Sequence, residues 1–507
     1  MRPDAVLIRA MNDTSKDQSP AESPKHGLPE LMAERRAKAA RLKEADAASF
    51  PYSYEGVEPI ADVLDAYERL AAGEETEERH RVAGRLAARR GSGGAAFLDL
   101  VDRTGKLQLH ARRDVLGDEA FERLTSLDIG DLLGVDGAAL RSKRGEISLR
   151  VDAFAVLAKA LRPPPDKHAG LSDVETRYRR RELDLIASED ARRLFMDRAK
   201  IVAAVRGYLD GQGFVEVETP VLQPLYGGAL ARPFTTHHNA LERTLYLRIA
   251  TELYLKRMLV GGLERVYELG KDFRNEGVST KHNPEFTMVE FYEAYADYEG
   301  VATRLEELVR AAAAAIGYDG EVDFAAAWRR VSFVQAIAQA TGIDLSSVGD
   351  ADGLRAAISE RDLQVRTEGA TWTQMADDLL SKFVEPTLAR PTFVLDYPVE
   401  LSPFAREHRS SPGLVERWEA FAGGMEIANA FSELNDADAQ RERFEAQRAA
   451  AEGGDEEAQP YDELFVQALE QGMPPAGGVG VGIDRLVMLL TGRDSIREVV
   501  LFPAMRD

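Results

Sequence analysis

The sequence contains no cysteine. Disulfides, thiolate zinc sites and cysteine nucleophiles are therefore excluded. It also lacks an unbroken apolar run of about 18 residues, the length that would indicate a transmembrane helix. A basic segment followed by an apolar one, as in a secretory signal, is missing near the start as well. From these absences we expect a cytoplasmic protein without a membrane partner.

A surplus of positive charge is missing too, since the net charge is −22. Nucleic acids favour basic surfaces, so this charge by itself argues against such a partner. The acidic residues are unevenly distributed, however, because the stretch from Glu77 to Ala160 holds 15 Lys and Arg against 13 Asp and Glu. The charge therefore leaves RNA binding open without supporting it.

Hydrophobic residues make up 44% and charged residues 30% of the 507, which is typical of a globular protein. A chain of this length is expected to form two or three domains. The prolines at 163–165 predict a stiff hinge, and we place a domain boundary there. The predicted organisation is a disordered tail (1–28), a helical segment (29–78), a barrel domain (79–160), a hinge or linker (161–189) and a larger domain (190–507).

The barrel domain is predicted from short β-type runs that glycine-bearing turns separate. One helix, 118–127, is expected between the third and fourth runs. Five strands in this order are typical of an OB-fold, which often binds single-stranded nucleic acid. The predicted strands are 81–88, 95–102, 106–111, 132–140 and 146–157. The basic helix expected after Pro29 fits a solvated surface and an RNA contact equally well.

The larger domain mixes strands and helices without regular alternation. A long amphipathic helix is predicted over 190–212, followed by a strand over 213–220 that Pro220 stops. This order favours an α+β fold, with a mostly antiparallel sheet flanked by helices, over a doubly wound fold. Further strands are predicted at 244–248, 265–269, 286–292, 392–396 and 425–432.

Charged residues follow the end of one predicted strand. Arg274 and Glu276 lie two residues apart and therefore on one face, and Glu290 and Tyr292 share a face of the next strand. The planar fork of an arginine suits a phosphate or a carboxylate, and a glutamate can accept a hydrogen bond from an exocyclic amine. Taken alone, such an Arg/Glu pair is more often a surface salt bridge.

Carboxylates recur further along, at Glu419 and Glu426. The strand spacing of two puts Asn429, Phe431 and Glu433 on one face and Glu426 on the other, unless a bulge intervenes. Buried carboxylates are costly unless they bind a cation, such as Mg²⁺ or a substrate ammonium. An exposed edge strand is the alternative interpretation of this segment.

A glycine-rich segment, 477–486, leads into an apolar helix that Arg485 opens. Glycines permit close approach of the backbone to a ligand. The spacing matches neither the phosphate loop nor the Rossmann fingerprint. With Asp484 and Arg485 behind the glycines, the segment indicates a ligand site of another kind.

In this order the segments resemble the three signature motifs of the class II aminoacyl-tRNA synthetases: 213–220 resembles motif 1, 273–276 motif 2 and 480–485 motif 3. The similarity is closest to the bacterial lysyl-tRNA synthetases of subclass IIb, and it runs from about Pro29 to Met505. The segments that carry this closer resemblance are 232–239, 253–257, 282–288 and 431–436.

The resemblance implies an OB-fold anticodon-binding domain, a class II catalytic domain and a homodimer formed through the motif 1 region. The implied reaction is activation of L-lysine by ATP, with Mg²⁺, to lysyl-adenylate, followed by transfer of lysine to the 3′ end of tRNA(Lys). Two alternatives stay open: a paralogue that transfers lysine to an acceptor other than tRNA, and a non-catalytic RNA-binding or regulatory protein built on a degenerate synthetase. The presence of Arg274, Glu426 and Arg485 argues against the second.

The resemblance also implies roles for individual residues. Arg274 would hold the α-phosphate and the substrate carboxylate, and Arg485 the γ-phosphate, which makes both catalytic. The implied ATP-binding residues are Arg274, Glu276, His282, Asn283, Phe286 and Arg485, and the implied Mg²⁺ ligands are Glu419 and Glu426. The implied lysine-binding residues are Gly228, Glu252, Glu290, Tyr292, Asn429, Phe431, Glu433 and Gly480. The implied anticodon-binding residues are Phe97, Gln108 and Glu146, although Phe97 would fit a barrel core equally well.

The acidic lining implied for the amino-acid pocket decides between related substrates. Carboxylates such as Glu252 and Glu433 attract an ammonium strongly and are left uncompensated by a neutral competitor, which favours lysine over asparagine. The pocket also departs from the family pattern in a way that affects its shape. Tyr226 and Thr251 stand where the family usually has prolines, and Ala428 and Ala430 where glycines are common.

Overall fold

The structure, a computed structural model, describes residues 27–45, 50–91, 93–165, 171, 173–229, 231–452 and 459–506. The predicted disordered tail lies outside these residues except at its last two positions, and part of the predicted linker lies outside them as well. The chain forms two compact units, Met1–Ala169 and Gly170–Asp507. Among the described residues, no helix is long and apolar enough to cross a membrane.

The first unit contains a closed five-stranded barrel with the order β1-β2-β3-β5-β4. Its elements are α1 (Leu28–Ala45), α2 (Ile60–Ala66), β1 (Glu75–Arg90), β2 (Ala95–Val101), β3 (Lys106–Arg112), α3 (Arg113–Leu116), α4 (Asp118–Thr125), β4 (Leu132–Arg141) and β5 (Ile147–Ala158). The OB-fold prediction is confirmed, including the helix after the third strand. The short helix α3 was not predicted.

Alternation along the strands decides which barrel residues face the core. Leu98 and Leu100 of β2 and Leu107 and Leu109 of β3 are fully buried inside the barrel. The side chain of Phe97, one position out of phase with them, therefore points to the outer face. The core interpretation of Phe97 is thereby excluded.

Helix α1 packs on the barrel through two of its basic residues. Arg35 is buried and donates to the backbone oxygens of Ala160 (2.8 Å) and Ile129 (3.2 Å). Lys38 pairs with Asp128 at 2.6 Å. The side chains of Arg35 and Lys38 therefore attach α1 to the barrel. The other basic residues of α1 are the ones available to bind a partner.

The second unit is built on an eight-stranded sheet with the order β12-β13-β14-β15-β16-β11-β10-β6. Its strands are β6 (Val215–Glu216), β10 (Arg265–Phe273), β11 (Glu285–Ala294), β12 (Arg329–Ser332), β13 (Thr392–Pro398), β14 (Leu414–Ala422), β15 (Met425–Ser432) and β16 (Ala476–Gly482). Inner neighbours pair antiparallel, whereas β12 pairs with β13, and β6 with β10, in parallel. The predicted α+β fold with a mostly antiparallel sheet is confirmed, and only the pair at each edge of this sheet is parallel.

The strand predicted over 213–220 is much shorter in the structure, because only Val215 and Glu216 join the sheet. Beyond them, Thr219 donates its backbone N–H to the side chain of Glu268 on β10 at 3.0 Å and not to a backbone oxygen of that strand. This hydrogen bond to the Glu268 side chain replaces the backbone-to-backbone hydrogen bond that Thr219 would make if the strand continued.

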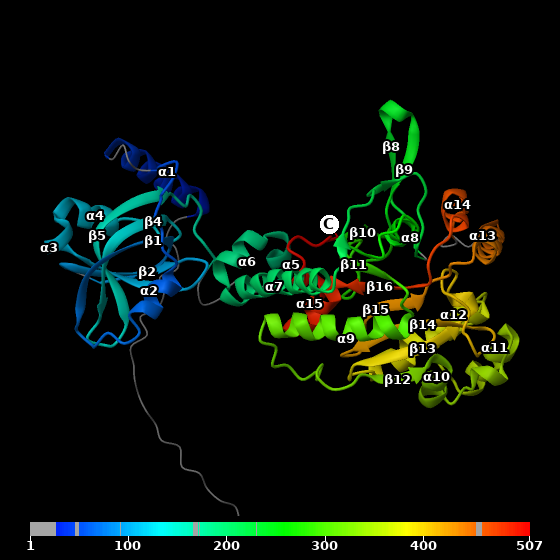
Figure 1. Cartoon of the computed structure of the whole chain (residues 1–507). Coiled ribbons are helices and arrows are strands. Elements are labelled where there is room, and N and C mark those ends of the chain that lie inside the picture. Colours follow the sequence, from blue (N-terminus) through cyan, green and yellow to red (C-terminus); the bar gives the residue numbers. More distant parts are fainter. Residues whose placement is uncertain are drawn as a thin grey trace, which may run out of the picture. The chain divides into compact units, whose positions relative to one another are not determined.

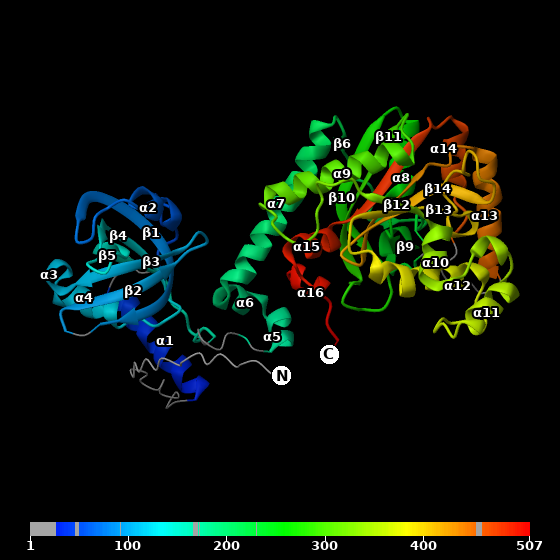
Figure 2. The same ribbon diagram turned by 90° about the horizontal axis from the view of Figure 1, so that it is seen from below.

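Three helices, α7 (Glu189–Gly211), α9 (Tyr298–Ala315) and α15 (Ile483–Thr491), pack on one face of this sheet (Figures 1 and 2). Their apolar sides bury Val289 and Phe291 of β11 and Val481 of β16 in the main core. Because strand residues alternate between faces, Met288, Glu290 and Tyr292 of β11 point to the opposite face. That opposite face carries the pocket.

Other helices complete the unit. Helices α10 (Phe333–Thr341), α11 (Ala351–Glu360) and α12 (Trp372–Leu379) gather beside β12 and β13 around a second core (Figure 1). Helices α8 (Glu252–Val260) and α14 (Glu463–Glu470) share a third core, next to α13 (Ala437–Glu452). Helices α5 (Val174–Arg179) and α6 (Arg181–Ala187) form within the residues predicted as linker, and α16 (Ile496–Val499) lies near the C-terminus.

A β-hairpin of β8 (Thr235–His238) and β9 (Arg243–Leu247) projects from the second unit (Figure 1). With β7 (Leu222–Gln223) it makes a three-stranded sheet of order β7-β9-β8. At its tip Glu242 has φ of 47°, a left-handed conformation that closes the turn. Leu241 beside it is 57% exposed, so the hairpin tip presents one large apolar side chain among polar ones.

Candidate active site

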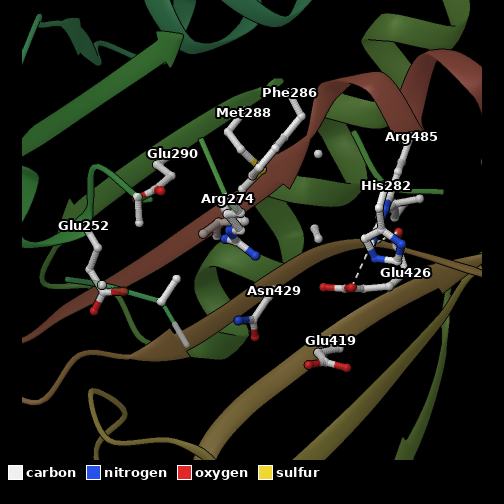
Figure 3. Close-up of a pocket in the computed structure, with 18 of the residues that line it drawn as sticks. Glu252, Arg274, His282, Phe286, Met288, Glu290, Glu419, Glu426, Asn429 and Arg485 are labelled. Carbon is white, nitrogen blue, oxygen red and sulfur yellow. Dashed lines mark hydrogen bonds and ion pairs between the residues drawn. The ribbon is translucent and has the colours of Figure 1, made fainter. Parts of the chain in front are cut away.

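A pocket of about 470 Å³ lies on the sheet face opposite the three packed helices (Figure 3). Strands β11, β14, β15 and β16 supply much of its lining, residues 274–284 between β10 and β11 supply another part, and the first turns of α8 and α15 lie at its two ends. Every predicted residue for ATP, Mg²⁺ and lysine lines this pocket except Glu433. The lining set is Gly228, Glu252, Arg274, Glu276, His282, Asn283, Phe286, Glu290, Tyr292, Glu419, Glu426, Asn429, Phe431, Gly480 and Arg485.

Arg274 occupies the middle of the pocket, directly after β10. Its guanidinium lies 5.1 Å from the centre of the Phe286 ring, and its Nε donates to the backbone oxygen of Ile249 at 3.4 Å. In Figure 3 it separates the carboxylates of Glu252 and Glu290 from the other end of the pocket. One cation is thus within reach of ligand groups at both ends.

The far end of the pocket holds the second arginine. Arg485, in the first turn of α15, donates from Nη1 to Glu426 Oε2 at 2.7 Å. Its Nη2 lies 3.2 Å from Nε2 of His282 (Figure 3). Burial, followed by the charge of Arg485, lowers the pKa of His282. The imidazole is therefore neutral near pH 7 and can accept the hydrogen bond from Arg485.

Glu419 and Glu426 lie on the same face, which corrects the strand-spacing prediction for Glu426. The register between β14 and β15 shifts, since Glu426 pairs with Phe421 while Ala428 pairs with Ala420. Ile427 is thus the extra residue of a β-bulge, and it packs into the main core. The bulge turns Glu426 to the pocket side, together with Asn429 and Phe431.

The Glu419 carboxylate is held by two neighbours. Arg417 Nη2 donates to its Oε1 at 2.6 Å, and the Tyr397 hydroxyl donates to its Oε2 at 2.8 Å. Burial raises the pKa of Glu419 to about 7, and the charge of Arg417 opposes this only in part. A cation in the pocket would stabilise the ionised form of this group.

The other end of the pocket is acidic and buried. Glu252, Glu290 and Tyr292 are each exposed by 5% or less. Burial raises the pKa of Glu290, and a hydrogen bond from the backbone N–H of Thr251 (3.1 Å to Oε1) partly offsets the rise. A proline at position 251 would lack this donor. The departure from the family pattern at Thr251 therefore adds a hydrogen bond to a pocket carboxylate.

Glu433 stands just behind the pocket wall, which differs from its predicted place in the lining. A methyl group on Gly478, which does line the pocket, would overlap Glu433 Oε1 and the Tyr292 ring. Glu433 Oε2 pairs with the ammonium of Lys256, a residue of the chain itself. Glu433 Oε1 has no hydrogen-bond partner among the described residues and is fully buried.

Sequence reasoning assigned no role to two charged residues of this site. Arg417 stands two positions before Glu419 on β14, a strand that was not predicted, and it also binds Asn429 Oδ1 at 3.0 Å. Lys256 follows Glu252 by four positions, which is one helical turn, and that spacing is the signal that would have found it.

Two carboxylates do not make a complete metal site by themselves. No group of three or more His, Cys, Asp or Glu side chains that could hold a metal ion is found in the described part of the chain. Mg²⁺ is commonly bound by one or two carboxylates, with phosphate oxygens and water as its other ligands. Glu419 and Glu426 fit this pattern if a triphosphate supplies the rest.

On the barrel, the three predicted anticodon residues lie at one outer surface. The Phe97 ring stacks on His110, with ring centres 4.7 Å apart and planes within 6°. Gln108 Nε2 donates to Glu146 Oε2 at 2.9 Å, and Ser148 donates to Gln108 Oε1 at 3.0 Å. Strand pairing brings Phe97 opposite His110 and Gln108 opposite Ser148.

Comparison with known proteins gives matches over both units. Residues 173–506 match the family of tRNA synthetases class II (D, K and N), and residues 80–157 match the OB-fold nucleic acid binding domain. A lysine–tRNA ligase of Chloroflexus aurantiacus is 51% identical over 489 residues, which cover 95% of this chain and 99% of the relative. Lysine–tRNA ligases of Halalkalibacterium halodurans (48%, covering 95% and 97%) and Carboxydothermus hydrogenoformans (47%, covering 94% and 98%) are similar over the same extent.

Proposed function

This chain belongs to the lysine–tRNA ligases, a family of class II aminoacyl-tRNA synthetases, and we propose that its larger unit forms lysyl-adenylate in the pocket on the open face of the sheet. One observation carries the proposal. A single cavity has buried carboxylates at one end and two arginines, Arg274 and Arg485, along the rest of its length. The first feature suits the ammonium groups of lysine, and the second suits a triphosphate.

In the proposed complex the nucleotide occupies the half of the pocket that contains Phe286, His282 and Arg485. Adenine stacks on the Phe286 ring, and Glu276 accepts a hydrogen bond from its amine. Arg485 leaves Glu426 to bind the γ-phosphate, while His282 and Asn283 flank the triphosphate. Support for this arrangement comes from the fact that all five side chains line the same cavity.

Mg²⁺ would arrive with ATP, and Glu419 and Glu426 would hold it. The ion would neutralise charge on the phosphate oxygens. If Arg485 turns to the γ-phosphate, Glu426 would be left without its ion-pair partner and would then be free to hold the ion. The pKa of Glu419 is high although Arg417 already pairs with it, which is consistent with a carboxylate that gains a second cationic partner on substrate binding.

Lysine would lie in the acidic half. Glu252 and the backbone at Gly228 bind the α-ammonium, whereas Glu433 and Tyr292 bind the ε-ammonium. Glu290, Asn429, Phe431 and Gly480 enclose the rest of the side chain. Gly228 has φ of 88°, and a side chain there would overlap Glu252, so only glycine allows this approach.

The chemistry needs no protein nucleophile. An oxygen of the lysine carboxylate attacks the α-phosphorus, the bond to the bridging oxygen breaks, and pyrophosphate leaves. Arg274 lies between the two halves and neutralises charge on the reacting groups as it develops. In the second step a terminal ribose hydroxyl of tRNA attacks the lysyl carbonyl, gives up its proton, and displaces AMP. Positioning and charge neutralisation account for catalysis in both steps.

Lysine-dependent exchange between ATP and pyrophosphate tests the proposal. We expect exchange in the presence of Mg²⁺ with lysine and none with aspartate or asparagine, because a carboxylate or an amide leaves the acidic end uncompensated. Charging of total tRNA with lysine should follow. Equal exchange with aspartate, or exchange without tRNA charging, would contradict it. The second outcome would favour an acceptor other than tRNA, which the near full-length similarity to lysine–tRNA ligases does not support.

We infer that the barrel binds the anticodon of tRNA(Lys) on the surface that Phe97, Gln108 and Glu146 share. Replacing Phe97 with alanine is expected to lower kcat/KM for tRNA by about 10- to 100-fold, since stacking of a base on an aromatic ring contributes about 1–3 kcal/mol. Lysine-dependent exchange should not change, because it does not involve tRNA. Tyr52→Ala, which removes a fully exposed aromatic side chain from the same unit, is the matched control. An equal loss in both variants would remove the stacking role.

We further propose a homodimer in the cytoplasm. The segments from β6 to the hairpin expose large apolar side chains, since Val215, Leu222 and Leu241 are each about half exposed. Exposed apolar side chains are typical of a subunit interface. Sedimentation equilibrium should give about twice the chain mass of 55.9 kDa. A monomer at micromolar concentration would exclude this assembly.

A further inference from the structure

A fully buried ammonium group lies beside the acidic end of the pocket. Lys256 of α8 has no exposed surface, and its Nζ is 2.5 Å from Glu252 Oε1. The same Nζ pairs with Glu433 Oε2. The aromatic rings of Phe404 and Phe431 lie 5.2 and 5.3 Å from it. One cation therefore joins the two carboxylates proposed to bind the two ammonium groups of the substrate.

Lys256 stays charged in this enclosed position. Burial alone would lower the pKa of its ammonium, but the charges of Glu252 and Glu433 outweigh burial and raise the pKa. Lys256 in turn stabilises the ionised form of its partners. Burial raises the pKa of Glu252 to about 7, and the charge of Lys256 limits this rise. Without this cation both carboxylates would be protonated more readily, and neither would hold an ammonium well.

The count of charges fits the substrate. When all three are ionised, Glu252, Glu290 and Glu433 bring three negative charges, and Lys256 removes one of them. Two remain, and lysine carries two ammonium groups, while Arg274 is left to match the lysine carboxylate. Without Lys256 the pocket would hold one carboxylate more than the substrate can neutralise, at a place where an unpaired charge is costly.

We propose that Lys256 is a positioning residue that fixes the Glu252 and Glu433 carboxylates and sets the net charge of the pocket to match a diamino acid. This inference rests on the proposed lysine-binding roles of those two glutamates. Lys256 acts through them and does not touch the substrate itself. The other ionisable groups that act on this cluster are Glu290 and Tyr292 of β11 and Arg417 of β14.

The test compares Lys256→Met, which keeps the length of the side chain, with Lys256→Arg, which keeps the charge. In Lys256→Met we expect KM for lysine in the exchange reaction to rise at least about tenfold, with KM for ATP unchanged. The acid limb of kcat/KM for lysine should move to higher pH by about one unit, because loss of the cation raises the pKa of the carboxylates. Lys256→Arg should recover part of both effects. Lys200→Met, an exposed lysine on α7, is the matched control.

A double variant keeps the inference testable if Lys256→Met does not fold. Glu252→Gln combined with Lys256→Met removes one charge of each sign, so the two remaining carboxylates give the same net charge as the three carboxylates and Lys256 of the unchanged protein. We expect its acid limb to lie close to that of the unchanged protein, although its KM for lysine stays high because Glu252 is lost. An unchanged KM for lysine and an unchanged acid limb in the folded Lys256→Met variant would overturn the inference. Absence of lysine-dependent exchange in the unchanged protein would instead overturn the proposed function.

Discussion

Arg274→Ala is expected to reduce lysine-dependent ATP–pyrophosphate exchange by about 1,000-fold or more, the effect typical of removing an arginine that stabilises charge in phosphoryl transfer. Arg274 is the cation in the middle of the pocket, within reach of both the α-phosphate and the lysine carboxylate in the proposed complex. Its loss would weaken substrate positioning and leave charge unneutralised in the transition state. We expect most of the effect in kcat, with smaller changes in KM for ATP and lysine.

Two further variants show whether the effect comes from the arginine fork itself. Arg274→Lys keeps the charge but cannot make two parallel hydrogen bonds, so it should recover only part of the activity. Arg361→Ala removes an exposed arginine that follows α11 and should leave exchange unchanged. Because the Arg274 side chain donates one long hydrogen bond to protein, to the backbone oxygen of Ile249, among the described residues, thermal unfolding of Arg274→Ala should stay close to that of the unchanged protein. Exchange within tenfold of normal would exclude the proposed role.

Much of the fold was predictable because the spacing of apolar residues along single segments matches the faces that those segments bury in the core. In the barrel, Leu98, Leu100, Leu107 and Leu109 alternate with polar or outward-facing residues, and that period fixes both the strands and the face each residue takes. The long helix α7 was likewise predicted to within a residue or two of its ends. Such segments bury one face only, so their apolar residues recur in the sequence with the period of the strand or helix.

Features that depend on the pairing of distant segments were not predictable. The bulge at Ile427 turns Glu426 into the pocket, and it becomes visible only when β14 and β15 are aligned. Strand β14 itself was missed, because its central residues are charged or aromatic in an irregular order. The two parallel edge strands follow from sheet order, which local periodicity does not encode.

The site residues depended on resemblance more than on pattern. The spacing of Arg274 and Glu276 does not distinguish them from an ordinary surface pair. Only the similarity of whole segments to a known family assigned them to the same site as Arg485, which lies more than 200 positions later. The structure places these residues around one cavity. It also reveals partners that no motif names, such as Arg417 on Glu419 and Lys256 between two glutamates.

Glu433→Ala is expected to abolish measurable lysine-dependent exchange at ordinary lysine concentrations. Glu433 Oε1 is buried without a hydrogen-bond partner among the described residues, and a substrate ammonium would satisfy it. Removing one member of a buried ion pair typically costs about 3–5 kcal/mol, which corresponds to a rise in KM for lysine of roughly 100- to several thousand-fold. Glu433→Gln, which keeps the shape, should lose nearly as much, because an amide does not compensate an ammonium.

The same variants separate lysine recognition from damage to the fold. KM for ATP, measured at saturating lysine where this can be reached, should stay within about threefold of normal, because Glu433 is not among the residues that line the pocket and pairs with Lys256 beside its acidic end. Lysine should raise the melting temperature of the unchanged protein and not that of Glu433→Gln, since only a ligand that binds the folded state stabilises it. A Glu433→Gln variant that lysine still stabilises fully would show that the ε-ammonium is held elsewhere. In that case the free Oε1 would belong to the packing around Lys256 alone, and the acidic end would be defined by Glu252 and Glu290.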